Sequence, residues 1–214
     1  MIGFIGGTGP EGKGLALRLA MAGQQVIIGS RSGERALEAV AELKIKAPAI
    51  SILGDENAEV ARRADLIFIT VPFDGHRVTL QALSDHLADK IVVDVVSNLA
   101  FINGHATAMT VPEGSAAEQA QEILPGSSVV SGFHNISAVN LLDPGKNVDG
   151  DVIICGDNIE AKKKVMGLAK LIPDLRAING GGLSNSHYVE EFTALLLNIN
   201  RIYKAHVGIR IVGI

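Results

Sequence analysis

The chain has 214 residues, of which 47% are hydrophobic and 20% charged, and its net charge is −4. This length allows one domain with a sizeable core and a small appendage. The slightly acidic balance argues against a nucleic-acid partner, and no apolar run is long enough to span a membrane. The single cysteine, Cys155, rules out an internal disulfide. We therefore expect a cytoplasmic protein without a nucleic-acid or membrane partner.

Strand-like and helix-like segments alternate along most of the chain. We expect strands over 2–6, 25–29, 49–53, 65–71, 91–95, 128–132 and 151–155, and helices over 12–22, 34–46, 56–63, 75–88, 115–124 and 158–171. Continuous apolar strands such as Leu66-Ile67-Phe68-Ile69 suit a parallel sheet that is covered by helices on both faces. The pattern predicts an α/β fold, Rossmann-like and doubly wound, with a mainly parallel sheet.

The stretch Gly180-Gly181-Gly182 interrupts this alternation, and one long helix is expected from about Asn185 to His206. Its wide apolar stripe predicts a core or subunit contact, and the apolar tail over 207–214 needs cover from the sheet or from a partner chain. We therefore expect a Rossmann-like domain over 1–180, a small C-terminal helical segment over 181–214 that completes a substrate cleft, and a homodimer.

A glycine-rich loop lies between the first strand and the first helix. It reads Gly7-x-Gly9-x-x-Gly12, the spacing with which such a loop binds a dinucleotide pyrophosphate. We expect Gly7 to allow the tight turn, Gly9 to let the phosphates approach the backbone, and Gly12 to let helix and strand pack closely. The same stretch fits most of a P-loop, but Gly14 stands where the magnesium-binding Ser or Thr would be. A dinucleotide site is the better interpretation.

The end of the second strand predicts which dinucleotide binds. An NAD site usually has Asp or Glu here, whereas this chain has Ser30-Arg31, followed by Arg35 one helical turn later. A guanidinium can hold the 2′-phosphate of NADP through charge-assisted hydrogen bonds, and a carboxylate would repel it. The residues therefore favour NADP(H) over NAD.

With these features the chain resembles the NADPH-dependent reductases of coenzyme F420 over essentially its full length. The resemblance is carried by Gly6-Gly7-Thr8-Gly9, Gly12-Lys13-Gly14-Leu15-Ala16-Leu17-Arg18-Leu19-Ala20, Gly29-Ser30-Arg31, Lys90-Ile91-Val92-Val93, Ser115-Ala116-Ala117-Glu118, Cys155-Gly156-Asp157, Gly182-Leu183-Ser184-Asn185-Ser186 and Leu196-Leu197-Asn198-Ile199. It implies hydride transfer between NADP(H) and coenzyme F420, an 8-hydroxy-5-deazaflavin, as co-substrate, in a cleft beside the C-terminal segment. Such chemistry needs no protein nucleophile, no metal and no catalytic triad, because the two rings only have to be held together.

The resemblance also implies roles for particular residues. The pyrophosphate would lie along Thr8, Gly9, Pro10 and Glu11, the 2′-phosphate between Ser30, Arg31 and Arg35, and the nicotinamide beside Val71, Pro72, Phe73 and Val96. The loop from His134 to Ala138 would approach the reacting rings, with His134 a candidate ring contact. His76 is expected either to touch a phosphate from the same cleft or to be only a first-turn residue.

Two positions depart from one example of the family, which has Pro where Ser137 stands and an indole where Phe73 stands. Both change the shape expected for the deazaflavin pocket. Two other functions stay open at this point. One is an NADPH-dependent reductase of a carbonyl, imine or ferric substrate, and the other is a non-catalytic module that senses NADP.

Overall fold

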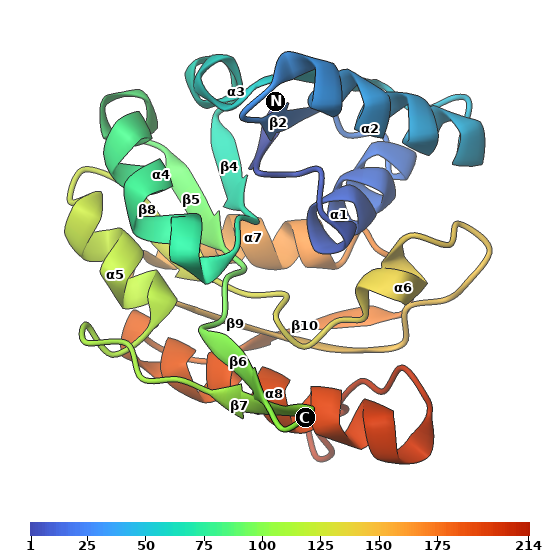
Figure 1. Ribbon diagram of the computed structural model, residues 1–214, viewed down its shortest axis with the longest axis vertical. Coiled ribbons are helices and arrows are strands. Elements are labelled where there is room, and N and C mark those ends of the chain that lie inside the picture. Colours follow the sequence, from blue (N-terminus) through green and yellow to red (C-terminus); the bar gives the residue numbers. More distant parts are fainter.

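The computed structural model describes residues 1–214 and contains one large sheet and one small one (Figure 1). The eight-stranded sheet has the order β10-β9-β8-β5-β4-β1-β2-β3, and β6 and β7 form a separate pair. The strands are β1 (Ile2–Ile5), β2 (Val26–Ser30), β3 (Ile52–Glu56), β4 (Leu66–Ile69), β5 (Ile91–Asp94), β6 (Leu99–Ile102), β7 (His105–Ala108), β8 (Ser128–Ser131), β9 (Gly150–Gly156) and β10 (Leu175–Asn179). The predicted Rossmann-like α/β fold is confirmed.

Helices connect the strands and cover both faces of the large sheet (Figure 1). They are α1 (Pro10–Met21), α2 (Gly33–Lys46), α3 (Asn57–Arg63), α4 (Phe73–Leu87), α5 (Ala116–Ile123), α6 (Ala138–Leu141), α7 (Ile159–Ala169) and α8 (Ser186–Tyr203), with a 3-10 turn over Leu183–Asn185. None of them is long and apolar enough to cross a membrane.

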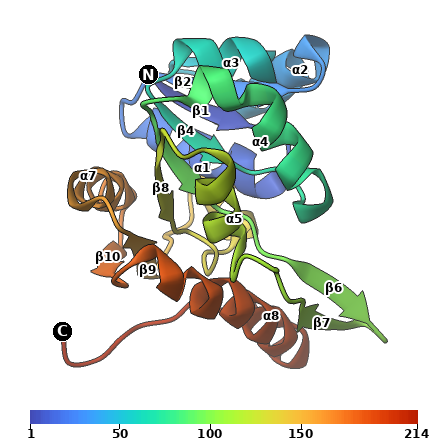
Figure 2. The same ribbon diagram turned by 90° about the vertical axis from the view of Figure 1, so that its left-hand side faces the viewer.

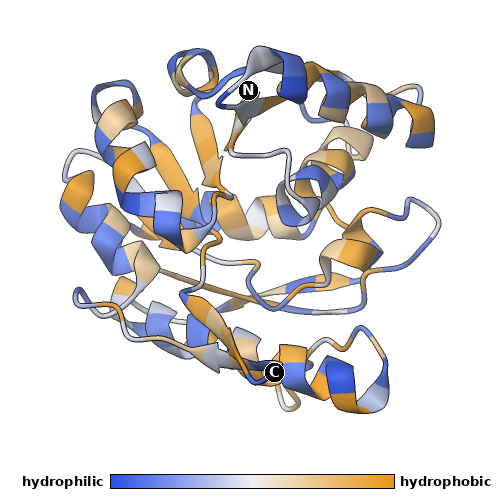
Figure 3. Ribbon diagram, viewed as in Figure 1, coloured by the Kyte–Doolittle hydropathy of each residue, from blue (hydrophilic) through white to orange (hydrophobic).

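Side chains along the central strands point alternately to the two faces of the large sheet, so the core consists of two layers. Phe4 and Phe68 stack at 4.7 Å between ring centroids on one face, in a cluster of 29 buried residues with side chains from α1, α2 and α7. Ile5 and Ile67 point to the other face, into a cluster of 18 residues with side chains from α3, α4 and α5. The central strands are mostly drawn in the hydrophobic colour in Figure 3, as expected for a parallel sheet that is buried on both faces.

The strand β9 was expected over 151–155, but its antiparallel direction, the edge strand β10 and the β6–β7 hairpin were not predicted. β9 runs antiparallel to β8, and β10 lies parallel to β9. The β6–β7 hairpin turns at Asn103 and Gly104, both with positive φ, and lies beside α8 (Figure 2). The amide of Asn198 on α8 bonds both backbone groups of Ala106, donating at 2.8 Å and accepting at 2.9 Å. The hairpin and α8 therefore form one layer beyond the edge of the large sheet.

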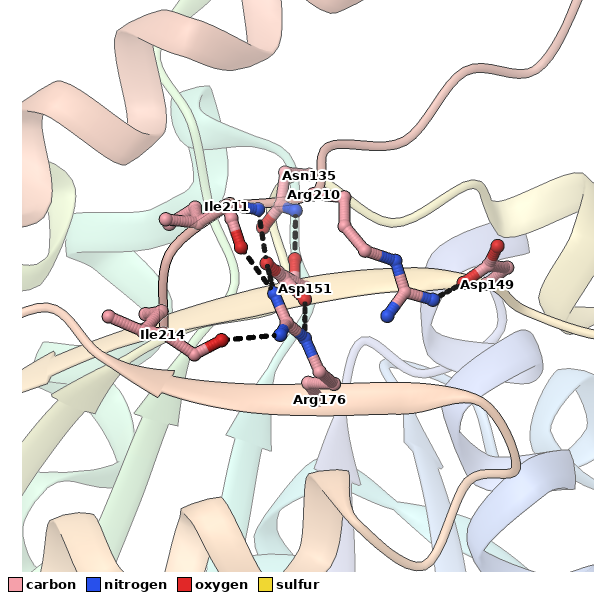
Figure 4. Close-up of polar contacts among 7 residues, drawn as sticks. All are labelled: Asn135, Asp149, Asp151, Arg176, Arg210, Ile211 and Ile214. Carbon is pink, nitrogen blue, oxygen red and sulfur yellow. Dashed lines mark hydrogen bonds and ion pairs between the residues drawn. The ribbon is translucent and has the colours of Figure 1, made fainter.

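The tail after α8 returns to β9 and β10 (Figure 4). The carboxylate of Asp151 accepts from Nε and Nη2 of Arg176, both at 2.7 Å, and from the backbone N–H of Ile211 at 2.6 Å. The backbone N–H of Asp151 donates to the Ile209 carbonyl at 2.8 Å. The expectation that the tail is covered is confirmed for these residues, although Val212 stays 93% exposed.

Candidate active site

The glycine-rich loop joins β1 to α1. Gly6, with a φ of +70°, makes the left-handed turn, and a Cβ there would collide with the side chain of Val71. Gly7 lies in the same turn and has no room for a side chain, since its Cβ would lie 2.7 Å from Phe4 Cβ, so the expectation that Gly7 allows the tight turn is confirmed. A Cβ on Gly12 would lie 2.7 Å from Gly7 Cα, which confirms the predicted close packing at Gly12.

Gly9 is the N-cap of α1 and differs from the other loop glycines. A Cβ there would meet nothing within 4 Å, so open space lies directly in front of its backbone. No side chain caps the helix, and Pro10 occupies its first position. The first-turn N–H groups and the positive end of the helix dipole are thus free to bind an anion in that space.

This space belongs to a cavity of about 660 Å³ at the carboxyl ends of β1, β2, β4 and β5. Ten of the residues predicted to bind cofactor line it: Thr8, Gly9, Pro10, Glu11, Ser30, Arg31, Arg35, Val71, Pro72 and Val96. Phe73 lines it as well. A ligand site outside the carboxyl ends of parallel strands is where an open α/β sheet places one.

One end of the first cavity is strongly positive. Arg31 follows the last residue of β2 and Arg35 lies in the first turns of α2; both are exposed. Neither forms an ion pair, whereas Arg62 and Arg63 nearby on α3 pair with Glu59 and Asp55. Two unpaired guanidiniums at the rim can bind an anionic group with forked hydrogen bonds.

A second cavity, of about 400 Å³, lies between the loop after β8 and helix α8. Its walls include Ile136, Ala138, Leu196 and Leu197, so they are largely apolar. Glu11 lines both cavities and is the residue that they share. A group in one cavity can therefore face a group in the other close to Glu11.

Unpartnered polar atoms gather at the second cavity. Glu11 Oε1, both ring nitrogens of His134 and Oδ1 of Asn135 are buried without a hydrogen-bond partner. Burial raises the pKa of Glu11 to about 8. Burial also lowers the pKa of His134 to about 4, against the opposing effect of Asp94, so its imidazole is neutral at pH 7. Buried polar groups are normally bonded, so these atoms mark a place where a polar ligand binds.

Comparison with known proteins agrees with this geometry. The profile of the family described as coenzyme F420-dependent NADP oxidoreductase matches residues 1–98. The F420-dependent NADP reductase of Methanothermobacter thermautotrophicus is 40% identical over 220 residues, covering 100% of this chain and 95% of that protein. The chain belongs to the F420-dependent NADP reductase family.

Other members of the family agree over the full length. The F420-dependent NADP reductase of Methanocaldococcus jannaschii is 39% identical over 220 residues, with 100% of this chain and 98% of that protein covered. A provisionally assigned F420-dependent NADP reductase from Arthrobacter sp. FB24 superposes with a TM-score of 0.82 at 25% identity, over 98% of this chain and 96% of the other. The C-terminal segment is therefore part of the shared fold of the reductase family.

His76, one of the residues predicted to bind cofactor, does not reach the first cavity. The side chain of His76 is fully buried behind the cavity wall. Its Nε2 lies 2.7 Å from Asp94 Oδ2 and its Nδ1 lies 3.0 Å from Gln119 Oε1. Asp94 Oδ1 also accepts from the N–H of Val96 at 3.0 Å. A phosphate contact from His76 is thus wrong; instead, His76 supports the backbone beside Val96.

Ala138 lines the second cavity and not the first, together with His134. The neighbouring Ser137 has a local structural role. It is the N-cap of α6, and its Oγ accepts from the N–H of Asn140 at 3.3 Å. A hydroxyl can cap the helix in this way.

Polar residues at the ends of β3 and β4 were missed by the sequence reasoning. Asn57 and Thr70 line the first cavity, as does Thr79 from α4. Asn57 Oδ1 accepts from the N–H of Gly6 at 3.1 Å, and the hydroxyl of Thr70 donates to the Ile5 carbonyl at 3.0 Å. Both bonds hold the glycine-rich loop. The available signal was position, because polar residues that follow parallel strands gather at one edge of the sheet.

Proposed function

We propose that this protein transfers a hydride reversibly between NADP(H), bound in the first cavity, and the deazaflavin ring of coenzyme F420, bound in the second. The observation that carries the proposal is the pair of cavities that meet at Glu11, one with an anion-binding loop and unpaired arginines and the other with apolar walls. The names of the curated relatives give the two substrates.

In the first cavity, the protein's task is to hold and orient a dinucleotide. The uncapped N–H groups after Gly9 would bind the pyrophosphate, and Arg31 and Arg35, with Ser30, would bind the 2′-phosphate. The nicotinamide would then lie at the other end, against Val71, Pro72 and Val96. The bond from Val96 to Asp94 keeps this wall in place.

In the second cavity, the protein's task is to present an acceptor ring and to exclude water. Apolar side chains from α8 and from the loop after β8 would cover the ring, and the neutral imidazole of His134 would bond a polar atom on it. NADPH supplies the hydride when it is bound. The protein contributes proximity and a dry site rather than a nucleophile.

The direct test uses purified protein, NADPH and oxidised F420, with loss of the deazaflavin absorbance as the readout. We expect rapid reduction with NADPH and much slower reduction with NADH. Turnover of a carbonyl, imine or ferric substrate without turnover of F420 would show that this substrate, and not F420, is the hydride acceptor. Tight binding of NADPH without turnover of any acceptor would identify a sensor instead of an enzyme.

We further propose that residues 1–180 form the dinucleotide-binding part, that residues 181–214 complete the cleft, and that the protein is a cytoplasmic homodimer. The buried, unpaired thiol of Cys155 is consistent with a reducing compartment. Tyr188, Ile202 and Tyr203 on α8 are 66%, 72% and 73% exposed, an apolar surface suited to a second copy. Sedimentation of the native protein and of Ile202→Asp tests this, since the substitution should yield a monomer.

A further inference from the structure

Glu11 is an acidic residue in an unusual place. It is the second residue of α1, where the helix begins at the Gly9 N-cap, and it lines both cavities. Its Oε1 is buried and bonded to nothing. Burial of this oxygen without a partner disfavours the carboxylate relative to the neutral acid.

The first cavity, which Glu11 lines, also holds the unpaired Arg31 and Arg35 and the carboxyl group of Asp74. The charged groups on α1 itself are engaged elsewhere. On α1, Lys13 pairs with Glu42, and Arg18 donates to backbone carbonyls from Asn140 to Lys146. Across the second cavity the titratable residues are His134, neutral at pH 7, and His206. Burial raises the pKa of Glu11 to about 8. A positive charge brought to the shared wall would reverse this balance.

We propose that Glu11 exchanges the proton that accompanies the hydride: its carboxyl is protonated beside the reduced nicotinamide and ionised beside the oxidised one. This inference rests on the proposed function, because it needs the nicotinamide to lie where the two cavities meet. The reduced nicotinamide is neutral and leaves the acid protonated. The oxidised ring is cationic and provides the counter-ion that Glu11 lacks.

The step balances in atoms and charge. A deazaflavin reduced by two electrons gains one hydride and one proton. As the C–H bond of the nicotinamide breaks and the new C–H bond forms on the acceptor, Glu11 loses its proton and the acceptor ring nitrogen takes it up. The ion pair of carboxylate and oxidised nicotinamide remains. In the reverse direction Glu11 takes the proton back, so it acts as acid in one direction and base in the other.

The test measures protons released on binding, without an acceptor. Calorimetric titrations of NADP⁺ and of NADPH, each in two buffers of different ionisation enthalpy, yield the proton count. At pH 7 we expect NADP⁺ to release about 0.9 more protons than NADPH, since a group of pKa about 8 is then mostly protonated. Below pH 8 the ratio of the two Kd values, NADP⁺ to NADPH, should fall about tenfold per pH unit. The 2′-phosphate titrates in both dinucleotides, so its contribution cancels.

Glu11→Gln should abolish the difference in proton release and make the ratio of Kd values independent of pH. The matched control, Glu38→Gln on the exposed face of α2, makes the same charge change and should behave as the wild type. Equal proton counts for the two dinucleotides in the wild-type protein, or an unchanged difference in Glu11→Gln, would overturn the role of Glu11 and leave the proposed function standing. A difference in proton release between the two dinucleotides, without turnover of F420, would support the role of Glu11 and overturn F420 as the acceptor. Failure of both dinucleotides to bind would overturn both proposals.

Discussion

Arg176 holds the fully buried carboxylate of Asp151 with two hydrogen bonds of 2.7 Å, and through it ties the tail to the loop of the second cavity (Figure 4). The same Arg176 donates to the carbonyls of Ile211 and Ile214. The carbonyl of Asp151 accepts from the amide of Asn135, beside His134, at 2.5 Å. One ion pair therefore connects three segments that are distant in sequence.

Arg176→Met should lower Tm by several degrees, because a buried carboxylate without its partner is costly. The Arg176 hydrogen bonds hold the pKa of Asp151 below its usual range, so the pair contributes stability above pH 3.8 that is lost as pH falls through the depressed pKa. Thermal unfolding at pH 7 and at pH 3 would check this. The difference in Tm between the wild type and Arg176→Met should be smaller at pH 3 than at pH 7. A difference of the same size at both pH values would contradict the role assigned to the ion pair.

Arg31→Ala should weaken NADPH binding by about 1.5–3 kcal/mol, roughly 10- to 150-fold in Kd, and leave NADH binding almost unchanged. The reason is the loss of a charge-assisted bond to the 2′-phosphate. Fluorescence titration of both dinucleotides measures the effect. Arg62→Ala, which removes an exposed arginine already paired with Glu59, is the control. Equal losses for NADPH and NADH would contradict the preference for NADP.

Gly9→Val should abolish binding of both NADPH and NADH while leaving the unfolding transition nearly unchanged. A Cβ at Gly9 would meet no atom of the surrounding protein within 4 Å, so the added side chain starts in the space proposed for the pyrophosphate. Gly12→Ala, in contrast to Gly9→Val, should lower Tm, because its Cβ would lie 2.7 Å from the Gly7 backbone. Binding titrations and melting curves of both variants separate the two effects. Normal binding by Gly9→Val would show that the pyrophosphate lies elsewhere.

Asp94→Asn should destabilise the protein by about 3–5 kcal/mol, since it leaves His76 in a buried site without its counter-ion. Burial lowers the pKa of His76, but the charge and hydrogen bond of Asp94 more than offset this, and the pKa is raised overall. The pair therefore stabilises the fold fully below pH 6.5, and this stability is lost as pH rises through the raised pKa. Proton NMR of His76 should show a lower pKa in the variant. An unchanged pKa would contradict the pairing.

Glu11 should make the ligand-free protein less stable as pH rises. Because burial raises its pKa from 4.5 to about 8, its stability contribution is complete below pH 4.5 and is lost as pH rises to about 8. The free energy of unfolding of Glu11→Gln should thus increasingly exceed that of the wild type between these pH values, by up to about 4 kcal/mol. Urea unfolding from pH 5 to pH 9 measures the gain. A constant difference between variant and wild type would show that the carboxyl is not buried in solution.

The sequence predicted best what is local in the chain. The loop around Gly9 and the arginines after β2 follow directly from strand, turn and helix signals, and ten of the predicted residues line one cavity. The second cavity is built from Glu11, the loop after β8 and α8, and no local pattern brings these together. His76 was misplaced for the same reason: its burial depends on Asp94 and on Gln119 of α5, which are distant in sequence.

Some misses had a usable signal. The dipeptide Asn103-Gly104 is a strong indication of a two-residue hairpin turn, and both residues have the positive φ that it requires. β10 is different, since its sequence alternates Arg176 with Ala177 and ends in Asn179, a pattern too short to separate from a loop. Its pairing with β9 is a tertiary event.

The residues that line the first cavity all lie between Gly6 and Ser97. Five strands from this part, β3-β2-β1-β4-β5, are adjacent in the sheet and need no later residue to pair with one another. During synthesis on the ribosome, this half of the sheet can therefore assemble while the later residues are still being added. Cellular NADPH would then meet its loop on a nascent chain and stabilise it by mass action before α8 exists. The acceptor cavity, which needs residues up to Val207, forms only when the chain is almost complete.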